Sequence, residues 1–286
     1  MAPTDIRAAT EHGPTDKMPD SSSRNSGEGA KQLFRSLLGP RALAAGRRIQ
    51  RRIRALFRPS DLGNLSLLYG SDKWMSHWYA QHYERHFWPL RRRRIKLLEI
   101  GVGGHDDPLA GGASLRMWRR YFPRGQIYGI DVYDKRVHDG SRIRTFQGDQ
   151  GDEAFLRKVI AKIGTPDVII DDGSHFNDHV IESFHTLFPL LATNGIYVVE
   201  DTQTSYWPHY GGSSTDLVGA PTSICFLKGL VDGINHEEFV RPGYRPSYFD
   251  EHIVSIHFHH NIVFIHKGAN KEGSIVKKNL PIPGVT

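Results

Sequence analysis

Apolar residues between positions 95 and 200 gather in short runs, each followed by a polar or glycine-rich turn. The runs lie at 95–100, 126–131, 143–146, 167–171 and 195–200. Segments with helical spacing lie between them, near 114–121, 152–163 and 177–191. Near-continuous apolar runs of this length are typical of strands buried on both faces of a parallel sheet. Their alternation with helices predicts a doubly wound α/β domain with right-handed crossovers.

Two more apolar runs lie near the end of the chain, at 253–258 and 261–265. They flank the polar pair His259-His260, which predicts a β-hairpin. We expect this hairpin to extend the sheet and to contribute one antiparallel strand to an otherwise parallel arrangement.

Composition divides the rest of the chain into appendages around this domain. Residues 1–30 hold few large apolar side chains and many Ser, Gly and Pro, so we expect them to be disordered. Residues 31–58 combine helical spacing with arginines, which fits either a helix for a membrane surface or acidic partner, or a solvated extension. The predicted organisation is an extension (1–58), a helical cap (59–94), the α/β domain (95–267) and a tail (268–286).

The net charge of +6 is concentrated in two arginine-rich stretches, at 41–58 and 91–94. The remainder is mildly acidic, so the charge says little about what the domain binds, and no nucleic acid is expected there. Cys225 is the only cysteine, which excludes intramolecular disulfides and multi-cysteine zinc sites. This cysteine usage favours a reducing, cytoplasmic setting. No apolar run is long enough for a transmembrane segment, and no secretory signal is evident.

A glycine-rich turn, Glu99-Ile100-Gly101-Val102-Gly103-Gly104, follows the first predicted strand. Ligands of doubly wound sheets bind beside such a turn, at the carboxyl ends of the strands. A dinucleotide fold would have a third glycine at position 106, where this chain has Asp106. The carboxylates around the turn would repel a pyrophosphate but attract the ammonium and sulfonium groups of S-adenosylmethionine. We therefore expect Glu99, Gly101 and Gly103 to contact that cofactor. The long stretch 106–112 after the turn has no explanation from the sequence.

Polar residues also follow the second and third predicted strands. Asp131 ends the second strand, where a carboxylate can accept both hydroxyls of a ribose. Gly148, Asp149 and Gln150 follow the third strand, and Asp149 either binds the adenine amino group or caps the next helix. The cofactor is therefore expected across the ends of the first three strands.

Carboxylates gather at the ends of the fourth and fifth predicted strands. Asp172 follows one and Glu200-Asp201 ends the other, and neighbouring parallel strands lie about 4.8 Å apart. An all-oxygen set favours Mg²⁺, which can bind two vicinal hydroxyls of an acceptor and lower the pKa of one. We expect Asp172, Glu200 and Asp201 to be the metal ligands. His175 comes three residues after Asp172 and is the candidate base.

Several alternatives stay open at this end of the site. Asp171 either contacts the cofactor or faces a neighbouring loop, and either Asp171 or Glu200 completes the metal set. His175 and His179 have the i, i+4 spacing of a zinc pair, although such spacing is common by chance. The histidines of the predicted hairpin are expected to be structural or solvent-facing; they are His257, His259, His260 and His266.

Four motifs occur together in this chain. They are Tyr69-Gly70-Ser71-Asp72-Lys73, Leu98-Glu99-Ile100-Gly101-Val102-Gly103-Gly104, Asp171-Asp172-Gly173-Ser174-His175 and Val199-Glu200-Asp201-Thr202. His77 and Tyr83 accompany the first motif, and Thr204-Ser205-Tyr206-Trp207 follows the last. In this combination the chain resembles the Mg²⁺-dependent sugar O-methyltransferases of macrolide biosynthesis, of the macrocin and mycinamicin type. It also resembles related actinobacterial enzymes that methylate polysaccharide sugars. The resemblance covers roughly residues 61–267.

The resemblance implies a class I methyltransferase fold, Rossmann-like, with S-adenosylmethionine and Mg²⁺ as cofactors. It implies a metal at the three carboxylates named above and a catalytic base at His175. It also implies that the 69–73 segment folds over the cofactor, so that Tyr69, Ser71 and Lys73 contact it. The acceptor would be a sugar hydroxyl of a polysaccharide, an oligosaccharide or a glycosylated natural product.

Other functions are also compatible with these residues. Chelation of vicinal hydroxyls would serve a methyltransferase for catechol-like phenolic diols equally well. From another class, the arginine-rich extension would suit an RNA-binding protein or an RNA methyltransferase. A non-catalytic nucleotide-binding module is disfavoured by the intact carboxylate set. The macrolide enzymes can carry a large N-terminal domain, which weakens the prediction of a macrolide acceptor for a chain with only a short extension there. A homo-oligomer is compatible with the sequence.

Overall fold

The computed structural model describes residues 61–274 and, before them, Gly46, Gln50 and Ile53. Apart from these three positions, the predicted extension at 1–58 lies outside the described residues, as does the tail after residue 274. Residues 61–274 belong to one compact unit. No helix in this described part is both long and apolar enough to cross a membrane.

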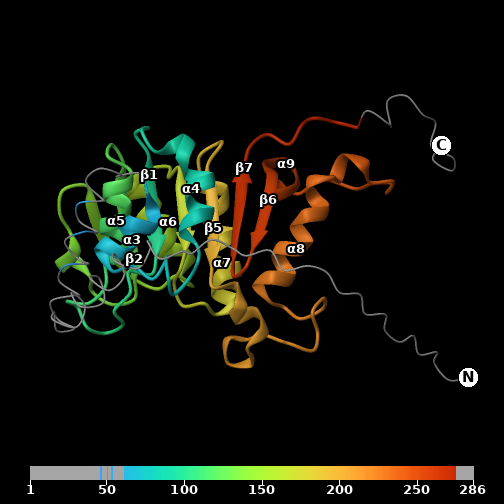
Figure 1. The fold of residues 1–286 in the computed structure, drawn as a ribbon. Helices are drawn as coiled ribbons and strands as arrows, with labels where there is room; N and C mark the ends of the chain where they lie inside the picture. The colour runs from blue at the N-terminus through green and yellow to red at the C-terminus, as the bar shows by residue number, and fades with distance from the viewer. Residues whose placement is uncertain (1–45, 47–49, 51–52, 54–60, 275–286) are drawn as a thin grey trace, which may run out of the picture. The chain divides into compact units, whose positions relative to one another are not determined.

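The centre of the domain is a seven-stranded sheet with the order β3-β2-β1-β4-β5-β7-β6 (Figure 1). Its strands are β1 Lys96–Ile100, β2 Gln126–Asp131, β3 Ile143–Gln147, β4 Val168–Asp171, β5 Ile196–Glu200, β6 Ile253–His259 and β7 Ile262–Lys267. Strands β1 to β5 pair in parallel, whereas β7 is antiparallel to both β5 and β6. The prediction of a parallel sheet with one antiparallel strand in a C-terminal hairpin is therefore confirmed.

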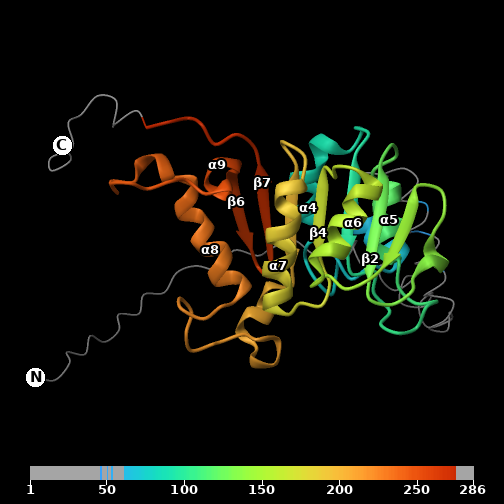
Figure 2. The ribbon, with the colours of Figure 1, turned by 180° about the vertical axis from the view of Figure 1, so that it is seen from behind.

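Helices cover both faces of this sheet (Figures 1 and 2). They are α3 Leu62–Tyr69, α4 Ala80–Phe87, α5 Ala113–Tyr121, α6 Glu153–Ile163, α7 Asn177–Leu187, α8 Ser223–Ile234 and α9 Tyr248–His252. The core on one face joins α3, α4 and α5 to the strands, and the core on the other joins α6, α7 and α8 to them. Successive strand residues alternate between the two cores: Leu97 belongs to the first and Leu98 to the second. This alternation explains why the strand sequences are apolar at nearly every position.

Two element ends differ from the pattern in the sequence. The helix expected near 177–191 ends at Leu187 and continues as a 3₁₀ turn over Phe188–Leu190, because Pro189 has no backbone N–H to donate. The first residues of the predicted tail are ordered against the domain, because the Asn270 amide donates to the carbonyls of Ile234 and Asp250.

The stretch 106–112 is held in place by a buried lysine. The Nζ atom of Lys135 donates to the carbonyl oxygens of His105, Asp107 and Ala110, at 2.7, 2.8 and 3.4 Å. Gly111 then packs directly against the glycine-rich turn, where any side chain would overlap the carbonyl of Gly103. The stretch thus supports the turn from its outer side, a role that the sequence did not indicate.

Candidate functional site

A pocket of about 700 Å³ opens at the carboxyl ends of the parallel strands. The predicted site residues that line it are Ser71, Gly101, Gly103, Asp131, Gly148, Asp149, Gln150, Asp172, His175 and Asp201. Five other predicted residues do not line it, namely Tyr69, Lys73, Glu99, Asp171 and Glu200. The structure thus brings together residues from the ends of all five parallel strands and from the segment that follows α3.

The glycine-rich turn and β2 form one side of this pocket. Both carboxylate oxygens of Asp131 accept backbone N–H groups, from Val102 at 2.9 Å and from Tyr133 at 2.9 Å. These bonds orient the carboxylate at the pocket wall and leave further lone pairs for a ligand's hydroxyls. Gly101 has a φ of 91°, and a Cβ atom there would lie 1.9 Å from the carbonyl oxygen of Asp172.

Gly101→Ala is therefore expected to destabilise the protein by about 2–5 kcal/mol, the sum of left-handed strain and forced displacement of the β4 backbone. Urea unfolding measures this change. Gly229→Ala is the matched control, because Gly229 lies on α8 with no atom near its Cβ position. That control should be neutral or slightly stabilising. Equal stability of the two variants would contradict the close approach of the two strand ends.

Glu99 lies behind the pocket wall and is completely buried. It accepts hydrogen bonds from Ser114 Oγ at 2.7 Å and from Trp118 Nε1 at 3.1 Å, both on α5. Burial raises the pKa of Glu99 to about 7, against the opposing effect of Lys73. In this structure Glu99 organises the polar layer beneath the turn.

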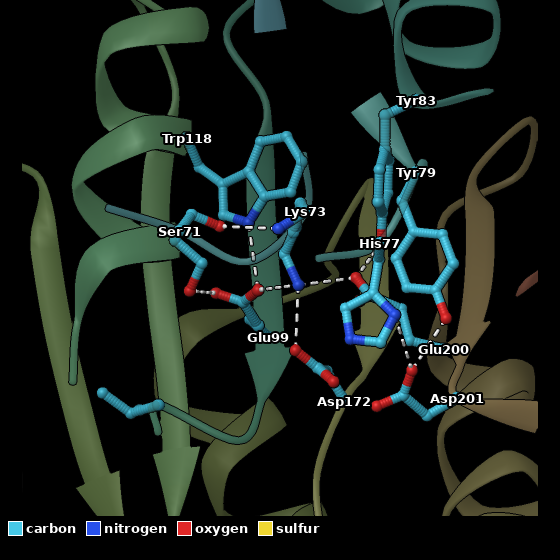
Figure 3. Close-up of polar contacts among 12 residues, drawn as sticks. Ser71, Lys73, His77, Tyr79, Tyr83, Glu99, Trp118, Asp172, Glu200 and Asp201 are labelled. Atoms are coloured by element: carbon cyan, nitrogen blue, oxygen red, sulfur yellow. Dashed lines mark hydrogen bonds and ion pairs between the residues drawn. The ribbon is translucent and has the colours of Figure 1, made fainter. Parts of the chain in front are cut away.

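Lys73 occupies the centre of that polar layer (Figure 3). Its Nζ atom lies 2.7 Å from Glu200, 2.8 Å from Asp172 and 3.5 Å from Glu99. Burial alone would lower the pKa of Lys73, but these carboxylates raise it well above its ordinary value, so the ammonium stays charged. Lys73 thus ties the segment after α3 to the ends of β1, β4 and β5.

Two tyrosines of the α4 region complete the carboxylate cluster. Tyr79 donates to Asp201 Oδ1 at 2.7 Å, and Tyr83 donates to the same oxygen of Glu200 that Lys73 contacts. His77 Nδ1 also lies 3.7 Å from Asp201. The i, i+4 spacing of the tyrosines was the only signal in the sequence for Tyr79, which lies outside the four motifs.

Two overlapping groups of side chains could hold a cation. The ligand atoms of Asp172, His175 and Asp201 lie within 4.8 Å of one another, and those of Glu99, Asp172 and Glu200 do so as well. Lys73 already neutralises the second group, whereas the first lines the pocket. The pocket-facing group therefore fits a divalent cation better.

The backbone at this group is in an uncommon conformation. His175 and Asp201 both have positive φ, 60° and 52°. Non-glycine residues in this region carry strain of about 1–3 kcal/mol each and cluster at functional sites. The two side chains approach each other, with His175 Nε2 3.6 Å from Asp201 Oδ2.

No protein-family model matches the chain, but characterised proteins do. It is 48% identical over 220 residues to the mycinamicin VI 2''-O-methyltransferase of Micromonospora griseorubida, a match of 76% of this chain and 55% of the relative. It is 39% identical over 262 residues to the L-olivosyl-oleandolide 3-O-methyltransferase of Streptomyces antibioticus, covering 89% of this chain and 68% of the relative. The chain belongs to the macrocin and mycinamicin family of O-methyltransferases.

Solved structures agree with this membership. The MycE methyltransferase of the mycinamycin biosynthetic pathway, in complex with Mg, SAH and mycinamycin VI, superposes with a TM-score of 0.73 at 41% identity. That match covers 92% of this chain and 68% of the other. The chain spans just over half the length of most of the curated family members that it matches.

Asp171, the last residue of β4 and the first of the Asp171–His175 motif, does not line the pocket. Asp171 is 1% exposed and accepts hydrogen bonds from Gln150 Nε2, at 3.1 Å, and from Ser183 Oγ. Gln150 in turn accepts from the backbone N–H of Ser174 at 2.6 Å. Asp171 therefore links the loop after β3 to helix α7, and Gln150 connects it to the loop after β4. This position favours the alternative in which Asp171 faces a neighbouring loop.

The buried Asp171 also predicts a pH dependence. Burial raises its pKa to about 6, although the bonds from Ser183 and Gln150 lower it. The folded state therefore binds more protons than the unfolded state between pH about 3.8 and 6, and this contribution to stability is lost as the pH rises through that window. Asp171→Asn can keep the hydrogen bonds, and because asparagine does not titrate, this variant does not lose stability at this position as the pH rises. Its stability relative to the unmodified protein should increase by about 1 kcal/mol from pH 5 to 7.5 in urea unfolding. A difference that does not change with pH would contradict the shifted pKa.

Proposed function

We propose that this protein is an S-adenosylmethionine-dependent, Mg²⁺-assisted O-methyltransferase that acts on a sugar hydroxyl of a glycosylated compound. The observation that carries the proposal is the continuity of one pocket from the Gly101–Asp131 end to the Asp172–His175–Asp201 end. A methyl donor at the first end and an acceptor hydroxyl at the second would be held side by side.

The cofactor end of the pocket suits S-adenosylmethionine. Asp131 offers a pre-oriented carboxylate to the ribose hydroxyls. Gly101 and Gly103 leave room for close approach of the ligand, and Gly148, Asp149 and Gln150 line the pocket where the adenine is expected. In the MycE structures SAH is present, which supports the same ligand class for this chain.

The other end supplies a proton acceptor and metal ligands. His175 would accept the proton of the acceptor hydroxyl. Its contact with Asp201 would orient the imidazole and stabilise the imidazolium that forms when His175 is protonated. Tyr79 holds Asp201 in place by its 2.7 Å hydrogen bond. We propose Asp172 and Asp201 as Mg²⁺ ligands. Glu200, which the sequence predicted as the third ligand, lies beneath the pocket, where Lys73 and Tyr83 already engage it. Bound Mg²⁺ would supply a Lewis acid that lowers the pKa of a coordinated hydroxyl.

The relatives support a sugar as acceptor. They include methyltransferases named for a rhamnosyl tetracenomycin C and for L-olivosyl-oleandolide, and both of these names contain a sugar. We infer that the acceptor here is a sugar carried by a natural product. The expected homo-oligomer, the absence of a nucleic acid partner and the cytoplasmic location stay predictions from the sequence.

Calorimetric titration of the full chain with S-adenosylhomocysteine, with and without Mg²⁺, tests the first part of the proposal. Micromolar binding would support it, and no binding under either condition would overturn it. A set of glycosides and their sugar-free aglycones then tests the acceptor. Methyl transfer to the glycosides alone supports a sugar hydroxyl, whereas equal transfer to phenolic aglycones would favour the catechol-type alternative. Activity that persists in Asp172→Ala with chelator present would exclude the metal role.

A further inference from the structure

Histidines gather at a second place in the domain, away from the carboxylates. His82 and His86 are four residues apart and lie on one side of α4. His257 and His259 alternate along β6, and His266 lies on β7 beside them. All of them are on the sheet face that carries α4, since His86 stacks on Phe264 of β7 with ring centroids 4.2 Å apart. We call His86, His257 and His266 the histidine triad.

The triad has the geometry of a metal-ligand set. One ring nitrogen from each of its members lies within 4.8 Å of the others. His86 Nδ1 and His266 Nε2 are 3.0 Å apart. Two imidazole nitrogens on one tetrahedral Zn²⁺, each about 2.0–2.1 Å from the ion, lie about 3.3 Å apart. Small side-chain rotations would bring the triad to that geometry.

The triad is also incompletely satisfied as a purely structural cluster. His86 is 8% exposed, and its Nε2 atom has no hydrogen-bond partner among the described residues. The neighbouring His259 likewise has a buried, unpaired Nε2 in this part of the chain. Buried polar atoms without a partner are uncommon in folded proteins, and ordered water often satisfies them. Because Nδ1 of His86 is the nitrogen that faces His266, an ion at the triad would leave Nε2 for such a water, as the second nitrogen of a metal-bound imidazole usually has a partner of its own.

We propose that the histidine triad is a second metal site, for Zn²⁺ or a similar imidazole-binding transition metal. Imidazole nitrogens select Zn²⁺, Cu²⁺ and Ni²⁺, whereas Mg²⁺ prefers oxygen, so the two sites would take different metals. Three protein ligands leave one coordination position for water. The ion would link α4 to the β6–β7 hairpin. Because α4 also carries Tyr83, and Tyr79 immediately precedes it, such a link would hold the tyrosines against the catalytic carboxylates.

One nearby charge opposes the ion. Arg85 lies on the same helix, is exposed, and acts electrostatically on His86, His257 and His259. Its repulsion would weaken binding of a divalent cation without preventing it, since an exposed side chain can turn into solvent. Arg85→Ser therefore tests the site from the opposite direction, because it should strengthen binding.

The experiment is a zinc titration of the full chain without a histidine tag. The protein is stripped with chelator, brought to saturating Mg²⁺ so that the carboxylate site is filled, and titrated with Zn²⁺ against a chromogenic zinc indicator. We expect one equivalent of tightly bound Zn²⁺ and a higher melting temperature in its presence. His86→Phe keeps the stacking on Phe264 and should weaken that binding more than about 100-fold, which exceeds the usual cost of outer-shell changes.

His185→Phe is the matched control, since His185 also packs among aromatic rings but lies on α7 outside the triad. It should bind Zn²⁺ as the unmodified protein does. If His86→Phe does not fold, His257→Gln on the edge strand replaces it, because His257 is only partly buried. The proposal is overturned if the unmodified chain binds no equivalent of Zn²⁺ at saturating Mg²⁺. It is also overturned if triad variants and the control bind Zn²⁺ equally.

Discussion

His175→Asn is expected to lower kcat for methyl transfer by about 10²- to 10⁴-fold, the usual contribution of a general base. Asparagine tolerates the positive φ of 60° at this position, so the loop after β4 should keep its conformation. Binding of S-adenosylhomocysteine should change little, because its proposed contacts lie at the other end of the pocket. Initial rates at saturating cofactor and acceptor, together with calorimetry, separate the two effects.

His179→Asn is the control for this prediction. His179 also lines the pocket, where its Nδ1 atom lies 3.0 Å from Ser174 Oγ. If His175 is the base, this variant should lose less than about tenfold in kcat, well below the range for a general base. Equal losses in the two variants would instead favour the histidine pair suggested by their spacing. A His175→Asn enzyme with near-normal kcat would remove His175 from the mechanism.

Lys73→Met is expected to have the largest effect on stability. It removes the one cation among Glu99, Asp172 and Glu200 and leaves buried carboxylates without compensation. Breaking a buried ion pair in this way costs about 3–5 kcal/mol. For a domain of this size that corresponds to a fall in melting temperature of roughly 10 °C. Thermal and urea unfolding at neutral pH measure the loss.

A double variant shows whether charge is the cause. Lys73→Met with Glu200→Gln removes one negative charge along with the positive one, and it should recover part of the lost stability. Added Mg²⁺ should also raise the melting temperature of Lys73→Met, since a cation can bind the uncompensated carboxylates. If the single variant is as stable as the unmodified protein, Lys73 does not hold the strand ends together.

The five parallel strands and the C-terminal hairpin could be predicted from the chain because their signals are local. A strand buried on both faces must be apolar at nearly every position, and Leu97 and Leu98 show this by serving opposite cores. The ends of these strands could also be predicted from local patterns. Asp131, Asp172 and Asp201 lie at these ends, so their positions in the pocket could be predicted as well. Parallel strands bring their carboxyl ends to one edge whatever their order in the sheet.

The roles of charged residues away from the strand ends could not be predicted in this way. The family resemblance implied that Lys73 contacts the cofactor, whereas its side chain lies beneath the pocket among the carboxylates. Its burial requires α3, β1, β4 and β5 to meet, which no local pattern encodes. The same holds for Asp171, whose partners Gln150 and Ser183 lie 21 and 12 residues away along the chain.

The sequence by itself determined the fold class, the strand ends that carry the site, and the family to which the chain belongs. These depend on periodicity and on short motifs, which are properties of neighbouring residues. Only the tertiary structure decided which carboxylates face the pocket and that Lys73 and Tyr83 both bind Glu200. It also decided that His86, His257 and His266 meet. A side chain's ionisation and its partners depend on burial and on contacts between distant segments, and those exist only once the chain has folded.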